Sequence, residues 1–338
     1  MTAVIKGIPT SLQKSLDATK VEYVRLGNSG LRVSWPILGT MAMGSSPYAT
    51  WLLNREESLK VLKAAYDSGI NTWDTSCVYS NGQSEEILGA AMRELNIPRQ
   101  KVVIMTKCGK GYVNHGGLSR AAIFKSVDDS LARLGTNYID LLQIHRFDPH
   151  TPLEETMRAL HDLVQAGKVR YIGASSMWAV QFAQMQFIAE KHGWTKLISM
   201  QNYYNLCYRE EEREMIRFCK GTGVGIIPWS PLFAGRLARP LGYDKSLRSK
   251  RPSPHHPGMT STDEEIIQRV EKLANEKDWN MSDVALAWHK SKSSIPIVGL
   301  NSADRVEEMS GLKGKELTDD EVKYLEEPYV ARAVAGHT

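Results

Sequence analysis

Four side chains of complementary chemistry follow short apolar runs in this 338-residue chain. Asp74 ends the run NTWDT and Tyr79 lies in the segment just beyond it, while Lys107 ends VVIMTK and His145 ends IDLLQIH. A phenol has a pKa of about 10, and a nearby ammonium favours its ionised form. A carboxylate beside the ammonium would keep it charged, and an imidazole can hydrogen-bond a substrate oxygen. Together the four groups suit a carbonyl group that must be polarised and then protonated.

Each of the four also has an ordinary structural explanation when taken singly. The carboxylate can cap a loop, the lysine stem can lie along apolar surface, the tyrosine can pack, and the histidine can be a satisfied structural residue. Their combination favours chemistry, because four such groups at the ends of neighbouring strands are hard to explain by packing.

The runs before these residues belong to a set of eight strand candidates. Their continuous apolar character is typical of strands that are covered on both faces. The candidates are residues 36–40, 71–75, 102–107, 139–145, 169–175, 198–204, 225–230 and 295–300. Amphipathic stretches lie between them, and three helix starts are predicted at Asn54, Thr151 and Thr262, each with a Glu three positions later.

This alternation predicts an α/β protein with a (β/α)8 TIM barrel over residues 21–325. A β-hairpin is expected over residues 21–34, before the first barrel strand, and extra helices are expected near the C-terminus. Residues 1–20 are predicted to form an arm and residues 326–338 a tail. A Rossmann fold is disfavoured because GTGVG (221–225) has the wrong glycine spacing and precedes a strand candidate.

Composition excludes several classes of function. The chain carries 42 Lys and Arg against 38 Asp and Glu, so 42 − 38 = +4, which gives no reason to expect nucleic acid or membrane binding. No apolar run is long enough to span a bilayer, and the N-terminus lacks a secretory signal, so a cytoplasmic location is expected. The four cysteines form no C-x-x-C pair, and no H-x-H or H-E-x-x-H motif predicts a metal site.

The pattern D-T-x-x-x-Y (Asp74, Thr75 and Tyr79), with Lys107 and His145, resembles the catalytic tetrad of the aldo-keto reductases. The order of the other segments is similar over roughly residues 22–325, and VYSNGQSEE, LLQIHRFDP, RYIGASSMW and MQNYYNL resemble fungal members of the versiconal hemiacetal acetate reductase and aryl-alcohol dehydrogenase type. The resemblance implies that Tyr79 is the general acid, that Lys107 and Asp74 tune it, and that His145 orients the substrate. It also implies a hydride from a nicotinamide cofactor that is bound without a Rossmann fold.

The resemblance further implies a set of cofactor contacts for NADPH. The set comprises Gly39, Thr40 and Met41 beside the nicotinamide ribose, Ser175, Ser176 and Gln201 at the carboxamide, Trp229 stacked on the nicotinamide, Ser230, Leu232, Gly235 and Arg236 along the pyrophosphate, Asn301 and Arg305 at the 2′-phosphate, and Glu308 at the adenine. This chain departs from the family where Met309 replaces the usual Asn at the adenine and Leu300 stands where a Lys is common.

The substrate is expected to be an aldehyde or ketone, aromatic or polyketide-like. Candidate rim residues are Met43, Tyr48, Trp51, Arg146 and Phe147, and Tyr203, Tyr204 and Phe233 are further candidates. Arg146 suggests an acidic or phenolic group on the substrate. Two other functions stay open: a cofactor-sensing subunit similar to the potassium-channel β subunits, which bear Asn in place of His145, and a tailoring enzyme with little net redox change.

Overall fold

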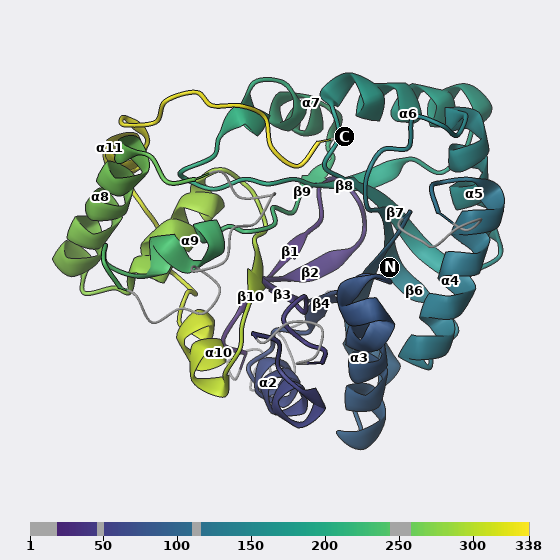
Figure 1. Ribbon diagram of the computed structural model, residues 1–338, viewed down its shortest axis with the longest axis horizontal. Helices are drawn as coiled ribbons and strands as arrows, with labels where there is room; N and C mark the ends of the chain where they lie inside the picture. Colours follow the sequence, from purple (N-terminus) through teal and green to yellow (C-terminus); the bar gives the residue numbers. More distant parts are fainter. Residues whose placement is uncertain (1–18, 46–50, 110–115, 244–257, 338) are drawn as a thin grey trace, which may run out of the picture.

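The computed structural model describes residues 19–45, 51–109, 116–243 and 258–337, and its eight-stranded parallel sheet confirms all eight strand candidates (Figure 1). The strands are β3 (Ile37–Gly39), β4 (Thr72–Asp74), β5 (Val103–Cys108), β6 (Ile139–Ile144), β7 (Val169–Ser175), β8 (Leu197–Gln201), β9 (Gly225–Ile226) and β10 (Ile297–Gly299). Their order in the sheet is β10-β3-β4-β5-β6-β7-β8-β9. Each strand of the run β3 to β9 therefore lies beside the next one along the chain.

The sheet curls until its two edge strands approach each other, which gives the predicted barrel. Ile295 N–H donates to the carbonyl of Ile226 over 2.8 Å, and Ile297 N–H donates to the carbonyl of Pro228 over 2.9 Å. Trp229 forms an isolated parallel bridge with Ile297. The predicted strand over residues 225–230 is shorter in the structure, because Pro228 has no N–H with which to continue a ladder.

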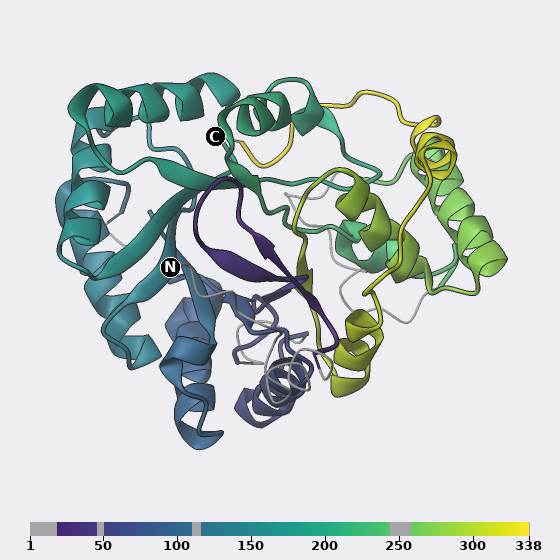
Figure 2. The same cartoon turned by 180° about the vertical axis from the view of Figure 1, so that it is seen from behind.

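Helices cover the outside of the barrel, as Figures 1 and 2 show from opposite sides. They are α2 (Arg55–Asp67), α3 (Gln83–Glu94), α4 (Arg120–Leu134), α5 (Leu153–Gln165), α6 (Ala179–His192), α7 (Met215–Thr222), α8 (Ser261–Lys277), α9 (Met281–Ser291), α10 (Ala303–Ser310) and α11 (Asp319–Glu326). No helix within the described ranges is long and apolar enough to cross a membrane.

The three predicted helix starts have different outcomes. Asn54 caps α2 in a capping box with Glu57, as predicted. The prediction at Thr151 is wrong, because its hydroxyl donates to Asp148 over 2.7 Å and Pro152 occupies the N-cap position. The prediction at Thr262 is also wrong: Thr260, two residues earlier, caps α8 and forms the box with Asp263.

The predicted hairpin closes one end of the barrel (Figure 2). It pairs β1 (Glu22–Arg25) with β2 (Arg32–Trp35) in antiparallel register. Asn28 N–H donates to Gly223 O over 2.8 Å, just before β9 begins, so the hairpin lies at the N-terminal ends of the strands. Gly27 makes this approach possible, because a Cβ there would lie 2.3 Å from the Gly223 oxygen. The opposite end, where the strands finish, is left for chemistry.

Candidate active site

Three of the four predicted catalytic side chains are joined by hydrogen bonds at the C-terminal ends of β4 and β5. The Lys107 ammonium lies 2.6 Å from Asp74 Oδ1 and 3.2 Å from the Tyr79 hydroxyl oxygen. It also donates to the carbonyl of Thr75 over 2.8 Å. Asp74 and Lys107 are buried, while Tyr79 is only half-buried. The phenol is thus the member of this group that stays accessible from outside.

His145 completes the group from the end of β6. Its ring faces the Tyr79 ring edge-on, with 6.0 Å between the ring centroids and 83° between their planes. Its Nδ1 atom lies 3.2 Å from the Ser76 hydroxyl, so one ring nitrogen is engaged by the segment that follows Asp74. The structure therefore brings all four predicted tetrad residues together at one end of the barrel.

The turn after Tyr79 fixes the phenol over the barrel. Tyr79 opens the 3-10 helix η1 (Tyr79–Gly82), in which Ser80 and Asn81 have φ angles of 48° and 54°. These left-handed conformations are uncommon outside glycine, and small polar residues tolerate them best. Backbone strain of this kind gathers at functional sites. The turn ends at Gly82, where α3 begins.

The electrostatics of the group keep Lys107 charged. Burial alone would lower the pKa of the Lys107 ammonium, because charge is unfavourable in a low-dielectric interior. The Asp74 carboxylate and the Tyr79 oxygen act in the opposite direction and prevail, so the pKa of Lys107 is raised. A charged ammonium thus lies 3.2 Å from the phenol oxygen.

Two glutamine amides hold the other side of the Asp74 carboxylate. Gln143 Nε2 and Gln201 Nε2 donate to Asp74 Oδ2 over 3.1 and 3.0 Å, and Gln201 Nε2 also lies 3.0 Å from Gln143 Oε1. Sequence reasoning did not find Gln143, which stands inside an apolar run two residues before His145. A polar residue facing the interior of a buried strand is the signal that would have revealed it. Gln201 was predicted to contact the nicotinamide carboxamide, but in this structure its amide nitrogen donates to Asp74.

The predicted nicotinamide residues gather at the ends of β7 and β8 and after β9. Trp229 Nε1 donates to the Ser176 hydroxyl over 3.1 Å, and the Ser175 hydroxyl donates to the Gln201 carbonyl over 2.7 Å. The Trp229 ring stacks on Tyr203 with 4.5 Å between centroids and 17° between planes. One face of the indole is therefore supported by the protein, which fixes the plane on which a nicotinamide would stack.

The predicted pyrophosphate segment has a strained backbone. Within the 3-10 helix η5 (Phe233–Ala238), Phe233 and Ala234 have φ angles of 48° and 56°, and Ser230 before it has a φ of 52°. Leu232 and Gly235 belong to the same curved segment. Arg236 Nη1 is buried and lacks a hydrogen-bond partner in the described part of the chain. An unpaired buried donor is costly, and an anionic group bound here would satisfy it.

Two arginines influence each other electrostatically near the predicted 2′-phosphate position. Burial lowers the pKa of Arg305, and the positive charge of Arg239 lowers it further. Like charges are placed together in proteins where an anion is to be bound. Arg239 was not predicted, because it lies in the long segment after β9, far in sequence from Arg305. Asn301 and Glu308, the two predicted neighbours of Arg305, are exposed before and within α10.

The remaining predicted cofactor residues lie at the end of β3. Gly39 and Thr40 are buried, and Met41 is 38% exposed. The Thr40 hydroxyl donates to the Asp74 carbonyl over 3.0 Å, which ties this segment to the tetrad. The Thr40 hydroxyl is thus hydrogen-bonded within the barrel, and Met41 is the residue of this segment that a cofactor could reach from solvent.

The predicted substrate residues are only partly assembled. Trp51, Arg146 and Phe147 are half-buried, whereas Met43 is fully buried, which contradicts its assignment to an accessible rim. Tyr48 lies outside the described residues. The further candidates are fully buried and do not form a rim; they are Tyr203, Tyr204 and Phe233.

Aromatic packing explains the burial of the two tyrosines. Tyr203 lies between Trp229 and Tyr208, with ring centroids 4.5 Å from each. Tyr204 packs against Trp288, with 5.0 Å between their centroids. The Tyr203 ring thus supports the indole of Trp229.

The predicted C-terminal tail returns to the barrel, where it lies near α7 in Figure 1. Arg332 pairs with Asp263 of α8 over 3.0 Å, and His337 Nε2 lies 2.8 Å from Glu211 Oε1. A Cβ on Gly336 would lie 3.1 Å from the Trp229 ring. The segment therefore touches the indole that is predicted to carry the nicotinamide.

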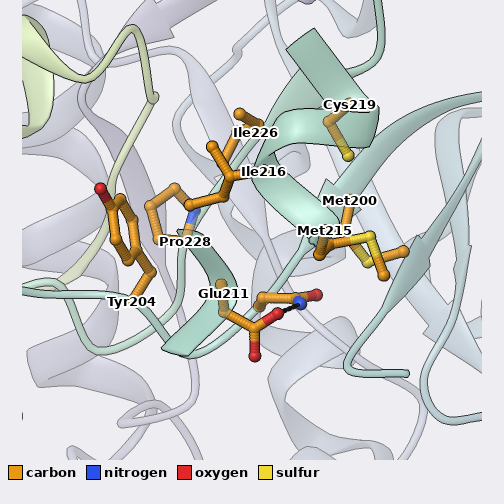
Figure 3. A pocket seen from close by; sticks show the side chains of 9 residues that line it. Met200, Tyr204, Glu211, Met215, Ile216, Cys219, Ile226 and Pro228 are labelled. Atoms are coloured by element: carbon orange, nitrogen blue, oxygen red, sulfur yellow. Dashed lines mark hydrogen bonds between the residues drawn. The ribbon is translucent and has the colours of Figure 1, made fainter. Parts of the chain in front are cut away.

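A small pocket beside β8 and α7 is separate from this group (Figure 3). Its lining includes Met200, Glu211, Cys219 and Ile226, and none of the tetrad residues. Glu211 accepts a hydrogen bond from Asn202 Nδ2 there. The lining is mostly apolar and its carboxylate is already paired, so the pocket has no groups left for catalysis.

The fold and the site define an α/β-barrel oxidoreductase, and comparison with known proteins identifies its family. The model of the aldo/keto reductase family matches residues 37–329, so the chain belongs to this family of oxidoreductases acting on carbonyl and alcohol groups. The family uses nicotinamide dinucleotide cofactors.

Similar proteins include an aldo-keto reductase of Fusarium vanettenii, 52% identical over 98% of this chain and 97% of its own length. Versiconal hemiacetal acetate reductase of Aspergillus parasiticus is 50% identical over 93% of this chain and 98% of its own length. A Schizosaccharomyces pombe protein named as an aryl-alcohol dehydrogenase is 46% identical over 93% and 97% of the two chains.

Proposed function

We propose that the chain reduces an aldehyde or ketone to the alcohol with NADPH, and that Tyr79 donates the proton. The observation that carries this proposal is the hydrogen-bonded line from Asp74 through Lys107 to Tyr79, with His145 facing the same phenol. When it is bound, the reduced nicotinamide supplies a hydride to the carbonyl carbon. The oxygen of the carbonyl then needs a proton, and the chain has to deliver it.

Each tetrad residue has a distinct part in that delivery. The substrate oxygen would lie between the Tyr79 hydroxyl and the His145 ring, where both can hydrogen-bond to it. The proton leaves the Tyr79 oxygen, and the ammonium of Lys107, 3.2 Å away, stabilises the negative charge that remains. Asp74 keeps Lys107 protonated through this cycle. His145 positions the carbonyl and polarises it.

The choice of NADPH is supported by the arginines near α10. The positive charges of Arg305 and Arg239 act on each other, and the 2′-phosphate of NADPH would neutralise them. The 2′-hydroxyl of NADH carries no charge and would leave their repulsion in place. Arg236, with its unpaired buried donor, would hold a pyrophosphate oxygen. Ser175, Ser176 and the supported indole of Trp229 would hold the nicotinamide end.

An aromatic or polyketide-like carbonyl compound is the proposed substrate class. Trp51 and Phe147 are half-buried aromatic residues suited to such a molecule. The names of two relatives, a versiconal hemiacetal acetate reductase and an aryl-alcohol dehydrogenase, point in the same direction.

Product analysis tests the proposal. The purified chain is incubated with NADPH and a panel of aromatic aldehydes and ketones, and both the NADPH consumed and the alcohol formed are quantified. We expect equal amounts of the two. Product without NADPH consumption would indicate a tailoring reaction without net redox change, and NADPH binding without any product would indicate a sensing role; either result would contradict the proposal.

A further inference from the structure

Arg146 is a positively charged residue that has no role in the chemistry of the tetrad. It follows His145 directly and is half-buried at the end of β6. Its Nη1 atom donates to the carbonyl of His145 over 2.6 Å and lies 3.3 Å from the Ser175 hydroxyl. Both partners are neutral. The guanidinium is thus oriented by the strand ends of β6 and β7, while its charge is not neutralised by them.

The acidic residues near Arg146 are already engaged by other groups. Asp74 is paired with Lys107 over 2.6 Å. Asp148, two residues further along, accepts hydrogen bonds from the Thr151 hydroxyl and from Leu118 N–H, each over 2.7 Å. No ion pair to Arg146 exists within the described residues. A desolvated charge without a counter-ion is costly, so the site is built for an anion that comes from outside the chain.

The position of the guanidinium also limits where that anion can lie on the substrate. Arg146 Nη1 is bonded to the carbonyl of His145, and the His145 ring faces the Tyr79 ring with 6.0 Å between the centroids, so the guanidinium is anchored beside the pair that is to hold the substrate oxygen. The carbonyl oxygen that is to be reduced has to reach Tyr79 and His145. An anion that meets Arg146 at the same time must therefore be attached at, or very near, the carbonyl carbon.

We propose that this site takes 2-oxo acids, and that Arg146 binds the carboxylate next to the carbonyl group. A guanidinium presents parallel N–H donors that match a carboxylate, and the Nη2 and Nε donors of Arg146 make no hydrogen bond in the described part of the chain. This inference rests on the proposed reductase function and narrows its substrate class.

The reaction balances as a two-electron reduction. The carbonyl carbon gains a hydride from the reduced nicotinamide and forms a C–H bond, and the carbonyl oxygen gains the Tyr79 proton and forms an O–H bond. The C=O π bond breaks and the carboxylate is unchanged. A 2-oxo acid, NADPH and one proton become a 2-hydroxy acid and NADP⁺, and solvent restores the proton to Tyr79.

Benzoylformate and its methyl ester form a matched pair of probes, because they share the aromatic ring and the ketone and differ in the negative charge. We compare kcat/KM for the two compounds in the wild type, in Arg146→Met and in Arg146→Lys, at saturating NADPH. Arg158→Met is the control, because Arg158 is an exposed arginine on α5. Dividing the acid-to-ester ratio of each variant by that of the wild type cancels the intrinsic reactivity of the ester.

We expect the acid-to-ester ratio to fall about 10- to 100-fold in Arg146→Met, since a lost charge-assisted hydrogen bond has that size. Arg146→Lys keeps the charge without the planar fork and is expected to give an intermediate ratio. Arg158→Met should leave the ratio unchanged. Arg158→Met should also leave the ester reaction and the NADPH affinity unchanged.

Two results would overturn the inference while leaving the reductase function intact. One is that the wild type reduces the ester or aromatic aldehydes but not benzoylformate. The other is that the acid-to-ester ratio does not change in Arg146→Met, as when NADPH affinity falls and both substrates lose rate equally. A failure of the proposed function itself differs from these, because no carbonyl compound would then consume NADPH.

A measurement on the wild type alone guards against a variant that does not fold. Mandelate, the 2-hydroxy acid product, should compete with methyl benzoylformate, and methyl mandelate should compete far more weakly. Equal inhibition by the acid and its ester would contradict the inference.

Discussion

Replacing Asp74 by Asn tests how the site keeps its lysine charged. Three donors converge on the Asp74 carboxylate: the Lys107 ammonium on Oδ1, and the amides of Gln143 and Gln201 on Oδ2. Asparagine offers only one acceptor oxygen, and its own NH2 group would face donors in either orientation. The variant therefore loses an ion pair and at least one hydrogen bond, with little change in volume.

The loss of stability expected in Asp74→Asn follows from the burial of the Asp74–Lys107 pair. Both members of the pair are almost fully buried, with side-chain exposures of 1% for Lys107 and 3% for Asp74. Removing one partner of such a pair costs about 3–5 kcal/mol in the free energy of unfolding. Without the carboxylate, burial dominates and lowers the pKa of Lys107, so the ammonium is lost at a lower pH. We expect kcat to fall about 100-fold or more, since that is the usual contribution of a positioned proton donor.

Kinetics and unfolding have to be measured together to separate the two effects. The alkaline decline of kcat should occur at lower pH in Asp74→Asn than in the wild type. Asp140→Asn is the matched control, because it breaks the Arg99–Asp140 pair of 2.6 Å, in which Asp140 lies near the start of β6, away from the tetrad. It should lower stability and leave the pH profile unchanged. An Asp74→Asn enzyme with the wild-type kcat and pH profile would refute the reasoning.

Three further substitutions test other parts of the account. Arg305→Ala is expected to weaken NADPH binding about 10-fold or more and NADH binding little, as measured by quenching of protein fluorescence; equal losses would show that Arg305 does not contact the 2′-phosphate. Arg239→Ala should likewise weaken NADPH binding and change NADH binding little. An unchanged NADPH affinity would show that Arg239 does not contact the 2′-phosphate. Burial lowers the pKa of His289 from 6.5 to about 3. As pH falls below 6.5, the imidazole of His289 therefore takes up a proton in the unfolded chain but not in the folded one. The free energy of unfolding then declines by about 1.4 kcal/mol per pH unit until pH 3 is reached. His289→Gln should flatten the dependence of unfolding free energy on pH between 6 and 4 in denaturant titrations, and an unchanged slope would contradict the assignment.

The barrel and the tetrad could be predicted because both follow from local patterns. Continuous apolar runs mark buried parallel strands, and the polar residues that end them must meet at one end of a closed sheet. Asp74, Lys107 and His145 lie at such ends, so their convergence did not require any knowledge of distances. The helix starts at Thr151 and Thr262 failed because several residues that can cap a helix stand close together, and hydrogen bonds made elsewhere decide between them.

The residues that were missed depend on contacts between distant segments. Gln143 is visible in sequence only as a polar residue inside an apolar run, and its partner Asp74 becomes apparent only when β6 lies beside β5 and β8 approaches Asp74. Arg239 acts electrostatically on Arg305 from a distant segment of the chain. Residues 326–338 were predicted to form a tail, whereas Arg332 pairs with Asp263 and His337 Nε2 lies 2.8 Å from Glu211, contacts that no periodicity can reveal.

The most direct test of the central claim compares the wild type with Tyr79→Phe. Oxidation of NADPH is followed by its absorbance with an aromatic aldehyde as substrate, and NADPH affinity is measured by fluorescence on the same samples. We predict that kcat falls about 100-fold or more while NADPH affinity stays nearly unchanged, because only the donated proton is removed. A Tyr79→Phe enzyme that turns over like the wild type would contradict the assignment of Tyr79 as the proton donor.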